Sequence, residues 1–311
     1  MILGSFVILI LFYAILNILI DITQAPACQG AKRAAIITIN RLLLLPKGGI
    51  MKKYIEAKII STQKISDKIH KMTLSCPEIA GVAVMGQFLN IYLDKGEMIL
   101  PRPISIQAVD KAAGTISIMY IIVGKGTAYM AELPVGHTLN IAGPLGKGFS
   151  YAGENKVALI GGGIGVPPLY YTAVQIIEQN PNAEIKAYIG FRDMDSFILE
   201  AEFRALGITT IVTTDDGSYG VPGNALEAFK NDDFKADIIY TCGPQGMLRA
   251  IANYAMSENI HCQVSMEERM GCGIGACVVC AIAIKDSEGE GFTYKRVCED
   301  GPVFCAKEVV W

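Results

Sequence analysis

Four cysteines near the C-terminus carry the clearest chemical signal in this chain. Cys272, Cys277 and Cys280 form a C-x4-C-x2-C run, and Cys298 follows it. This is the plant-type spacing of the thiolates that hold a [2Fe–2S] cluster. Glycines between the first two cysteines allow a tight loop that turns backbone N–H groups toward the sulfurs. The pattern therefore predicts a one-electron iron–sulfur centre.

A non-redox zinc-knuckle binding module is the alternative interpretation of these cysteines. Structural zinc sites usually present two separated C-x2–4-C pairs. Here three of the cysteines share one glycine-rich loop, which suits a cluster better than a single zinc ion.

Composition limits the remaining classes. The 311 residues have room for two or three domains, and 27 Lys+Arg against 30 Asp+Glu give no basic excess for nucleic acid. Nine cysteines, an odd number, argue against a secreted disulfide scaffold and favour a cytoplasmic protein. No catalytic acid/base pair or nucleophile arrangement is present, and the histidines are scattered: His70, His137 and His261.

The first fifty residues differ from the rest. Residues 3–20 are almost entirely apolar, which is long enough for a membrane-spanning helix, and the basic residues after them would leave the body of the protein on the cytoplasmic side. The competing hypothesis is that residues 1–50 are translated upstream DNA. Met51 opens directly into a strand pattern, and Lys47-Gly-Gly-Ile50 can be encoded by a ribosome-binding sequence.

Residues 51–150 are predicted to form a small closed antiparallel barrel, because short β-rich stretches alternate with turn signals. The six predicted strands are Tyr54–Ser61, Ile69–Leu74, Gln87–Leu93, Ile104–Ala108, Thr115–Val123 and Thr138–Ala142.

Two features stand out on this barrel. Arg102-Pro103-Ile104-Ser105 places a cation, a rigid turn and a hydroxyl at a strand start. About twenty residues on, Gly124-Lys-Gly126-Thr127 is expected to open a helix over Thr127–Leu133 with Thr127 as its N-cap. Free N–H groups at such a helix start favour an anion.

Residues 151–265 are predicted to form a Rossmann-like parallel sheet with helices on both faces, since strand and helix patterns alternate. An apolar strand from Lys156 runs into Gly161-Gly-Gly163-Ile-Gly165-Val-Pro-Pro168 and then a helix, an arrangement that places a diphosphate on helix N–H groups. Further predicted elements are strands 184–191, 208–214, 236–242 and 260–265 and helices 194–206 and 245–258. Ligands of such sheets sit at the carboxyl ends of the strands.

Together the barrel motifs resemble the flavin module of the ferredoxin–NADP reductase superfamily. The resemblance implies FAD, with the diphosphate near Gly126 and Thr127. Its implied flavin contacts are Arg102, Pro103, Ile104, Ser105, Met119, Tyr120 and Ile121. The implied contacts to NAD are Gly161, Gly163, Gly165, Cys242, Gly243 and Pro244, the last three forming that superfamily's Cys-Gly-Pro turn.

The order of barrel, nucleotide fold and C-terminal [2Fe–2S] domain (266–311) narrows the resemblance. Ser265–Cys280 and Val297–Phe304 resemble the electron-transfer subunits of type 1B dihydroorotate dehydrogenase. That implies Cys298 as the fourth cluster ligand, with Cys305 and Cys262 as alternatives by proximity. It also implies an FMN-containing dihydroorotate dehydrogenase catalytic subunit as partner, in a heterotetramer, with electrons passing through the cluster and FAD to NAD⁺ in pyrimidine biosynthesis.

A second enzyme class shares this architecture, namely subunits of NAD(P)H:ferredoxin or sulfide oxidoreductase complexes. The spacing G-C-G-x-G-x-C-x-x-C and the segment V-C-x-D-G-P-V-F favour the orotate branch. Asp215 and Asp216, near the expected ribose site, would disfavour a 2′-phosphate and so favour NAD over NADP.

Overall fold

The computed structural model describes residues 53–94, 96, 98–286 and 291–311. They all belong to one compact unit that spans 46–311. Both hypotheses about residues 1–50, including a span over 3–20 and a start at Met51, lie outside the described residues. Within the described ranges, no helix is long and apolar enough to cross a membrane.

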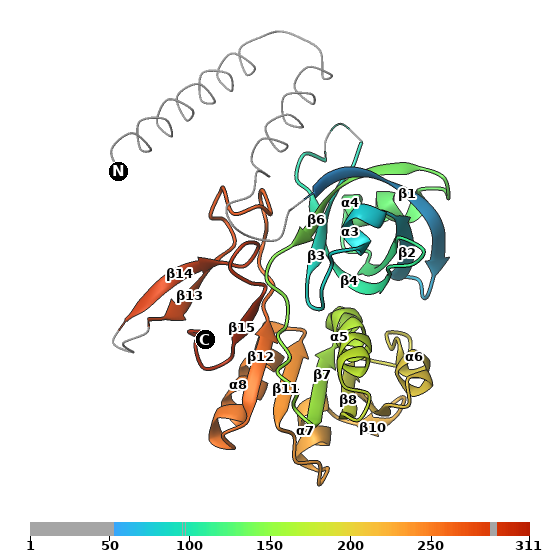
Figure 1. Cartoon of the computed structure of the whole chain (residues 1–311). Helices are drawn as coiled ribbons and strands as arrows, with labels where there is room; N and C mark the ends of the chain where they lie inside the picture. The colour runs from blue at the N-terminus through green and yellow to red at the C-terminus, as the bar shows by residue number, and fades with distance from the viewer. Residues whose placement is uncertain (1–52, 95, 97, 287–290) are drawn as a thin grey trace. The chain divides into compact units, whose positions relative to one another are not determined.

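The first part of the described chain is a closed six-stranded antiparallel barrel, drawn in blue to green in Figure 1. Its strands are β1 Lys53–Lys64, β2 Ile69–Ser75, β3 Phe88–Tyr92, β4 Arg102–Asp110, β5 Thr115–Ile121 and β6 Thr138–Leu145, with the short helix α3 Pro77–Ala80 after β2. The strand order around the barrel is β1-β2-β5-β4-β3-β6. Alternate residues such as Leu89, Ile91, Ile116 and Ile118 are fully buried in its core. All six strands predicted from the sequence are therefore present.

Strand β4 changes partner half-way along. Its second half pairs with β5, from Ile106 opposite Ile118 to Asp110 opposite Thr115. Its first half pairs instead with β3, where Arg102 lies opposite Ile91. Beyond Ile106 and Ile118 the register contains no further pair between β4 and β5. The start of β4 and the end of β5 are thus neighbours without a shared ladder.

A seven-stranded sheet follows, in the order β10-β9-β8-β7-β11-β12-β15. Its parallel strands are β7 Lys156–Gly162, β8 Glu184–Phe191, β9 Thr209–Thr214, β10 Val221–Pro222, β11 Ile238–Cys242 and β12 His261–Ser265. The chain starts at β7, moves outward to β8, β9 and β10, and then returns to the other side of β7 as β11. The switch point between β7 and β11 is where open α/β sheets bind ligands.

The helices of this sheet are α5 Val166–Gln179, α6 Glu200–Ala205, α7 Ala225–Lys230 and α8 Gln245–Ser257, with a short 3₁₀ turn, η1 Gly163–Gly165, before α5. Right-handed crossovers place α5 and α8 on opposite faces, because the chain moves in opposite directions across the sheet at these two connections. Helix α5 also contacts the barrel: the Tyr171 hydroxyl donates to the Ala83 carbonyl at 3.0 Å, and Gln175 Oε1 accepts from the Met85 N–H at 2.6 Å.

Two expectations about this sheet were incomplete. The helix predicted over 194–206 begins only at Glu200. A turn closed by Ser196 and Asp193 precedes it, and Leu199 takes a left-handed φ of 66°, which no helix interior tolerates. Helix α7 was not predicted; it starts at Asn224, whose side chain accepts the Glu227 N–H at 3.0 Å.

One half-buried carboxylate ties the turn after α7 to the sheet. Asp232 accepts hydrogen bonds from Lys186 at 3.0 Å and Tyr188 at 2.8 Å, both on β8. Burial acts to raise the pKa of Asp232, but the hydrogen bonds from Lys186 and Tyr188 outweigh it, so its pKa lies below the usual value.

The C-terminal part consists of a hairpin, β13 Ala281–Lys285 with β14 Phe292–Arg296, and the strand β15 Val303–Cys305. β15 pairs antiparallel with β12, so that Gln263 lies opposite Cys305 and Ser265 opposite Val303. Figure 1 shows it as the outer strand of the sheet beside β12. The last strand of the nucleotide sheet therefore comes from the segment that carries the cysteines.

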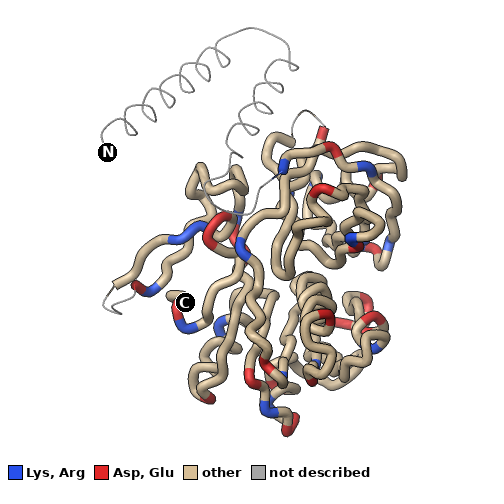
Figure 2. Tube along the Cα trace, in the orientation of Figure 1, with Lys and Arg blue, Asp and Glu red and all other residues tan. Residues whose placement is uncertain are grey.

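Charges are dispersed over this part of the molecule. Lys and Arg alternate with Asp and Glu along the described trace (Figure 2), and several of them pair locally, as Arg204 does with Glu200. Charges of both signs are therefore interspersed over the described residues, in line with the formal net charge of −3.

Candidate cofactor sites

The cysteine loop points backbone N–H groups at its sulfurs. Cys272 Sγ accepts from the N–H groups of Ile274, Ala276 and Cys277 at 3.3–3.4 Å. Cys298 Sγ accepts from the Gly275 N–H at 3.1 Å, although it lies on a separate segment. Such bonds stabilise thiolate charge, which is the state that ligates iron.

Three of the four thiols are coupled to one another. A hydrogen bond from Cys298 is the main reason why the pKa of Cys272 falls to about 4, and the same bond raises the pKa of Cys298, which also contacts Cys280. The two shifts describe one proton shared by a pair of sulfurs. Cys280 and Cys298 are buried, whereas Cys277 is exposed.

The cysteine arrangement fits a two-iron cluster better than one ion. Cys272, Cys277 and Cys280 share one short loop, and Cys298, on a separate segment, accepts the Gly275 N–H of that loop. A structural zinc ion needs four ligands at one point, whereas a [2Fe–2S] cluster spreads four thiolates over two irons. Cys305 lies on β15, and its sulfur makes none of the bonds described for the loop.

Arg296 connects the two cysteine segments, a role that the sequence analysis missed. Its guanidinium donates to the Gly275 carbonyl at 2.7 Å and to Asp300 at 3.1 Å. The Asp300 contact is the main reason why the pKa of Arg296 is raised. An Arg four residues before an Asp, around a cysteine, is the only signal the sequence carries for it.

The two barrel features predicted to form an anion site lie together. The Arg102 guanidinium packs against Gly126, where an added Cβ would overlap it. Arg102 also donates to the Leu100 carbonyl, and it forms no ion pair with any described carboxylate. Burial lowers its pKa. A partly desolvated cation without an acidic partner is a good fit for a diphosphate.

The helix beside it, α4 Lys125–Glu132, differs from the expectation. It begins at Lys125 with Gly124 as N-cap, and Thr127 is the third helical residue. The Thr127 hydroxyl accepts the Val123 N–H at 3.0 Å, so it fixes the helix start from inside. Thr127 is 7% exposed. The assignment of Thr127 as N-cap was therefore wrong. The N–H groups of residues 125 to 127 have no partner within the helix.

The other predicted flavin residues border the point where β4 leaves β5. Pro103 is exposed, and Ile104 and Ser105 are half-buried. On β5, the side chains of Met119 and Tyr120 are both buried, and burial raises the pKa of Tyr120 to about 12. Met119 and Tyr120 can therefore offer mainly backbone to a cofactor.

The predicted nucleotide residues meet at the switch point of the sheet. Gly165 abuts the turn after β11, where an added Cβ would lie 2.5 Å from the Cys242 carbonyl oxygen. A Cβ added at Gly243 would lie 3.0 Å from the Gly162 nitrogen. Gly163 has a φ of +53°, and a Cβ added there would have no atom within 4 Å, so its surface is open. Cys242 is buried, which raises its thiol pKa to about 12 and keeps it a neutral wall of the site.

The two acidic residues after β9, Asp215 and Asp216, have different surroundings. Asp216 accepts from the Ser218 hydroxyl at 2.6 Å and from the Ser218 N–H at 2.9 Å, and these bonds lower its pKa. Asp215 is exposed at the strand end. Both charges lie at the carboxyl edge of the sheet, where a dinucleotide ribose is expected.

Comparison with known proteins agrees with these sites. Residues 56–151 match the oxidoreductase FAD-binding domain, residues 159–253 the oxidoreductase NAD-binding domain, and residues 267–310 the iron–sulfur cluster binding domain of dihydroorotate dehydrogenase B. A protein of Geobacillus thermodenitrificans named "Dihydroorotate dehydrogenase B (NAD(+)), electron transfer subunit" is 38% identical over 256 residues, covering 81% of this chain and 96% of that protein. The chain belongs to the family of dihydroorotate dehydrogenase B electron transfer subunits.

Other members and one solved structure extend this result. The electron transfer subunit of Desulforamulus reducens is 35% identical over 265 residues, which are 84% of this chain and the whole of that protein. A solved NADH-dependent reduced ferredoxin–NADP oxidoreductase is 27% identical, with a TM-score of 0.74 over 85% of this chain and 91% of that one. A ferredoxin–NADP⁺ reductase from Neisseria gonorrhoeae, 16% identical with a TM-score of 0.57, shares the fold. The predicted fold class and the three cofactors are thereby confirmed.

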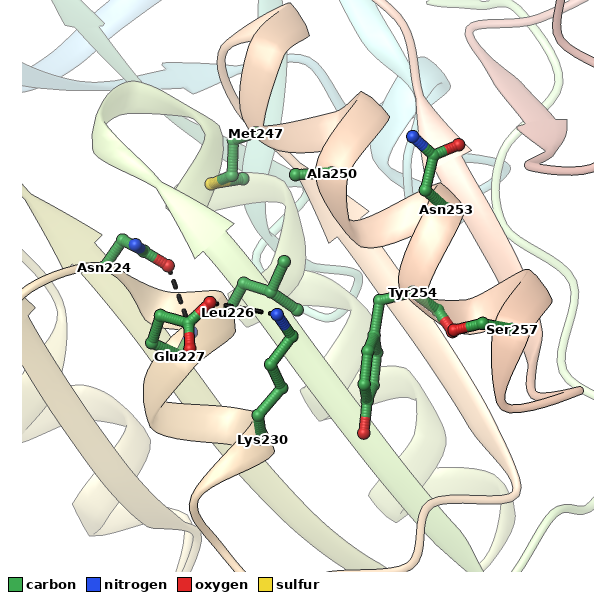
Figure 3. A pocket seen from close by; sticks show the side chains of 9 residues that line it. All are labelled: Asn224, Leu226, Glu227, Lys230, Met247, Ala250, Asn253, Tyr254 and Ser257. Atoms are coloured by element: carbon green, nitrogen blue, oxygen red, sulfur yellow. Dashed lines mark hydrogen bonds and ion pairs between the residues drawn. The ribbon is translucent and has the colours of Figure 1, made fainter.

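A surface hollow of about 560 Å³ lies between α7 and α8, outside the cofactor sites described above (Figure 3). Its walls include Asn224, Lys230 and Tyr254, and Lys230 is paired with Glu227 at 2.9 Å. Met247, at one end of the hollow, also lies beside Gly162 and Gly243 at the switch point. The hollow carries no group suited to redox chemistry.

Proposed function

We propose that this chain carries electrons from a dihydroorotate-oxidising FMN subunit through a [2Fe–2S] cluster and FAD to NAD⁺, in pyrimidine biosynthesis. The cysteine segment supports this proposal best. Its sulfurs accept hydrogen bonds from backbone N–H groups, and residues 267–310 match the iron–sulfur domain of this enzyme class. A bound flavin exchanges two electrons with a nicotinamide and single electrons with the cluster.

The proposal gives each group of residues a task. Arg102 and the start of α4 would hold the FAD diphosphate, and the open backbone at Gly163 beside Cys242 would receive the nicotinamide dinucleotide. Cys272, Cys277, Cys280 and Cys298 would hold the cluster. No residue of the chain needs to act as an acid or a base, since the cofactors exchange the electrons.

The partner we propose is an FMN-containing catalytic subunit, joined to this chain in a heterotetramer in the cytoplasm. The relatives' names support a second subunit, because each is called an electron transfer subunit. NAD is the proposed acceptor, since the carboxylates at 215 and 216 would repel the 2′-phosphate of NADP.

Co-purification with the catalytic subunit tests the proposal. We expect a complex that contains FAD, FMN and iron, and that reduces NAD⁺ when dihydroorotate is added. A Cys298→Ser complex is the matched control: it should keep its FAD and lose dihydroorotate-dependent NAD⁺ reduction. A wild-type complex that carries all cofactors but cannot reduce NAD⁺ would refute the proposal.

A second candidate follows from the structural neighbour that is an NADH-dependent ferredoxin–NADP oxidoreductase, at a TM-score of 0.74. It predicts NADH-dependent reduction of a ferredoxin without any dihydroorotate. Assaying both electron donors on the same preparation separates the two functions.

A further inference from the structure

Asn90 is a buried polar residue that neither the chemistry of FAD nor that of the cluster requires. It lies on β3, where the neighbouring core residues Leu89 and Ile91 point into the barrel. Because side chains alternate along a strand, Asn90 and Tyr92 point outward. Asn90 is nevertheless fully buried. Something outside the barrel therefore covers it.

The cover is the cysteine loop. Asn90 Nδ2 donates to the backbone carbonyl of Cys272 at 3.2 Å. Gly273, the next residue, has a φ of +68°, and an added Cβ there would overlap the Asn90 amide. The loop thus approaches Asn90 as closely as backbone can, and only glycine allows it.

The other edge of Asn90 faces the flavin segment. In the β3–β4 ladder Asn90 lies opposite Pro103, and Ile91 opposite Arg102. Asn90 thus lies on the strand that pairs with the proposed flavin contacts and also binds the first cluster ligand. Its Oδ1 has no hydrogen-bond partner among the described residues, whereas its Nδ2 makes the bond to the Cys272 carbonyl.

We propose that Asn90 is a positioning residue, which holds the loop of Cys272 against the flavin barrel and thereby sets the rate of electron transfer between flavin and cluster. This rests on the proposed function. The rate of electron transfer falls steeply with distance. If the loop moves away from the barrel, the transfer rate should therefore fall even while the loop still holds its cluster. The second cysteine segment has its own attachment, since the Lys147 N–H donates to the Gly301 carbonyl.

The reaction to follow is one-electron transfer inside the loaded protein. NADH and a proton reduce FAD by two electrons, giving NAD⁺. One of these electrons then passes to the cluster, taking its iron pair from two ferric ions to one ferric and one ferrous ion, while the flavin keeps the other. Stopped-flow absorbance resolves bleaching of the flavin from bleaching of the cluster.

We expect Asn90→Ala to keep its iron and FAD, and to accept hydride from NADH at the wild-type rate. Transfer from flavin to cluster should slow by about tenfold, because loss of a buried hydrogen bond can leave the loop docked for about a tenth of the time. Thr73→Val is the control: it removes a barrel hydrogen bond to Ser117, of 3.0 Å, far along the chain from the loop, and should leave the transfer rate unchanged.

Gly273→Ala tests the same contact from the loop side. Its Cβ should displace the Asn90 amide and slow transfer in the wild-type background. In the Asn90→Ala background the clash is absent, so the added effect of Gly273→Ala should be smaller. The backbone strain that alanine causes at φ +68° is the same in both backgrounds, so it cancels when the two effects are compared.

Three results would overturn the inference: an unchanged transfer rate in Asn90→Ala, an equal slowing in Thr73→Val, or full additivity of Asn90→Ala and Gly273→Ala. Loss of iron or FAD from Asn90→Ala would also overturn it, since it would make Asn90 a folding or ligand-binding residue. A wild-type protein that shows no transfer from flavin to cluster would instead refute the proposed function.

Discussion

Replacing Arg102 by Ala should weaken FAD binding without affecting the cluster. The guanidinium is partly buried, packs on Gly126 and has no described carboxylate partner. A well-formed charge-assisted hydrogen bond to a diphosphate contributes about 1.5–3 kcal/mol. Its loss corresponds to a decrease in affinity of about ten- to a hundredfold.

Two further variants grade the effect. Arg102→Lys keeps the charge but loses the planar fork of donors, so its affinity should fall between those of the wild type and Arg102→Ala. Gly126→Ala leaves the arginine in place but pushes its guanidinium aside, because the added Cβ would overlap it. We expect it to reproduce part of the Arg102→Ala loss.

The assay is release of FAD on dilution, followed by flavin fluorescence, with iron measured on the same samples. Iron should stay at the wild-type level, since the cysteines lie in another segment. The melting temperature adds a test of cause: Arg102→Ala should lower it with FAD bound and change it little without FAD, because only the bound state offers the cation an anionic partner. Full FAD retention after extensive dilution, or an equal loss of stability without FAD, would refute this reasoning.

The remaining predictions concern the cluster, the nucleotide site and the sheet. Cys298→Ser should lose most of its iron, whereas Cys305→Ser should keep it; the reverse result in an iron assay would reassign the fourth ligand. Gly165→Ala should raise the KM for NADH by about tenfold or more, because its Cβ meets backbone that cannot yield, whereas Gly246→Ala, with no atom within 4 Å, should bind NADH normally. Asp232→Asn should lower the melting temperature by about 2–4 °C at pH 7. Because the pKa of Asp232 is lowered in the folded protein, its carboxylate stabilises the fold above the unfolded pKa of 3.8, and this contribution is lost as the pH falls through the folded pKa. The difference in melting temperature between the wild type and Asp232→Asn should therefore vanish in acid. A difference that persisted in acid would argue against the ion pair.

The barrel could be predicted from sequence because each strand is short, alternates in polarity and ends at a turn. The same local signals placed α8 and the first strand of the sheet. They failed at residues 194–199, where the composition suits a helix but a Ser–Asp turn and a left-handed leucine prevent it. They also failed at β15, whose three residues are too few to show a period.

The candidate sites divide in the same way. Spacing predicted Cys272, Cys277 and Cys280 as cluster ligands, and the family resemblance added Cys298. The strand–turn–helix pattern predicted the glycines of residues 161–165 as nucleotide contacts. Thr127 was placed as an N-cap because a threonine after glycine is common there, whereas the structure has it inside the first turn of the helix. Asn90 had no sequence signal of its own, and Arg296 had only its four-residue spacing to Asp300, since their roles come from partners 182 and 21 residues away.

The pairing of β15 with β12 limits how the protein can be divided. A fragment that ends at residue 265 would leave the N–H and C=O groups of β12 exposed along a sheet edge, and such edges recruit other chains. A fragment that starts at 266 would contain β15 with nothing to pair with. We therefore expect that the cluster segment cannot be transplanted as a module, and that an exchange between homologues must carry β12 and the C-terminus together.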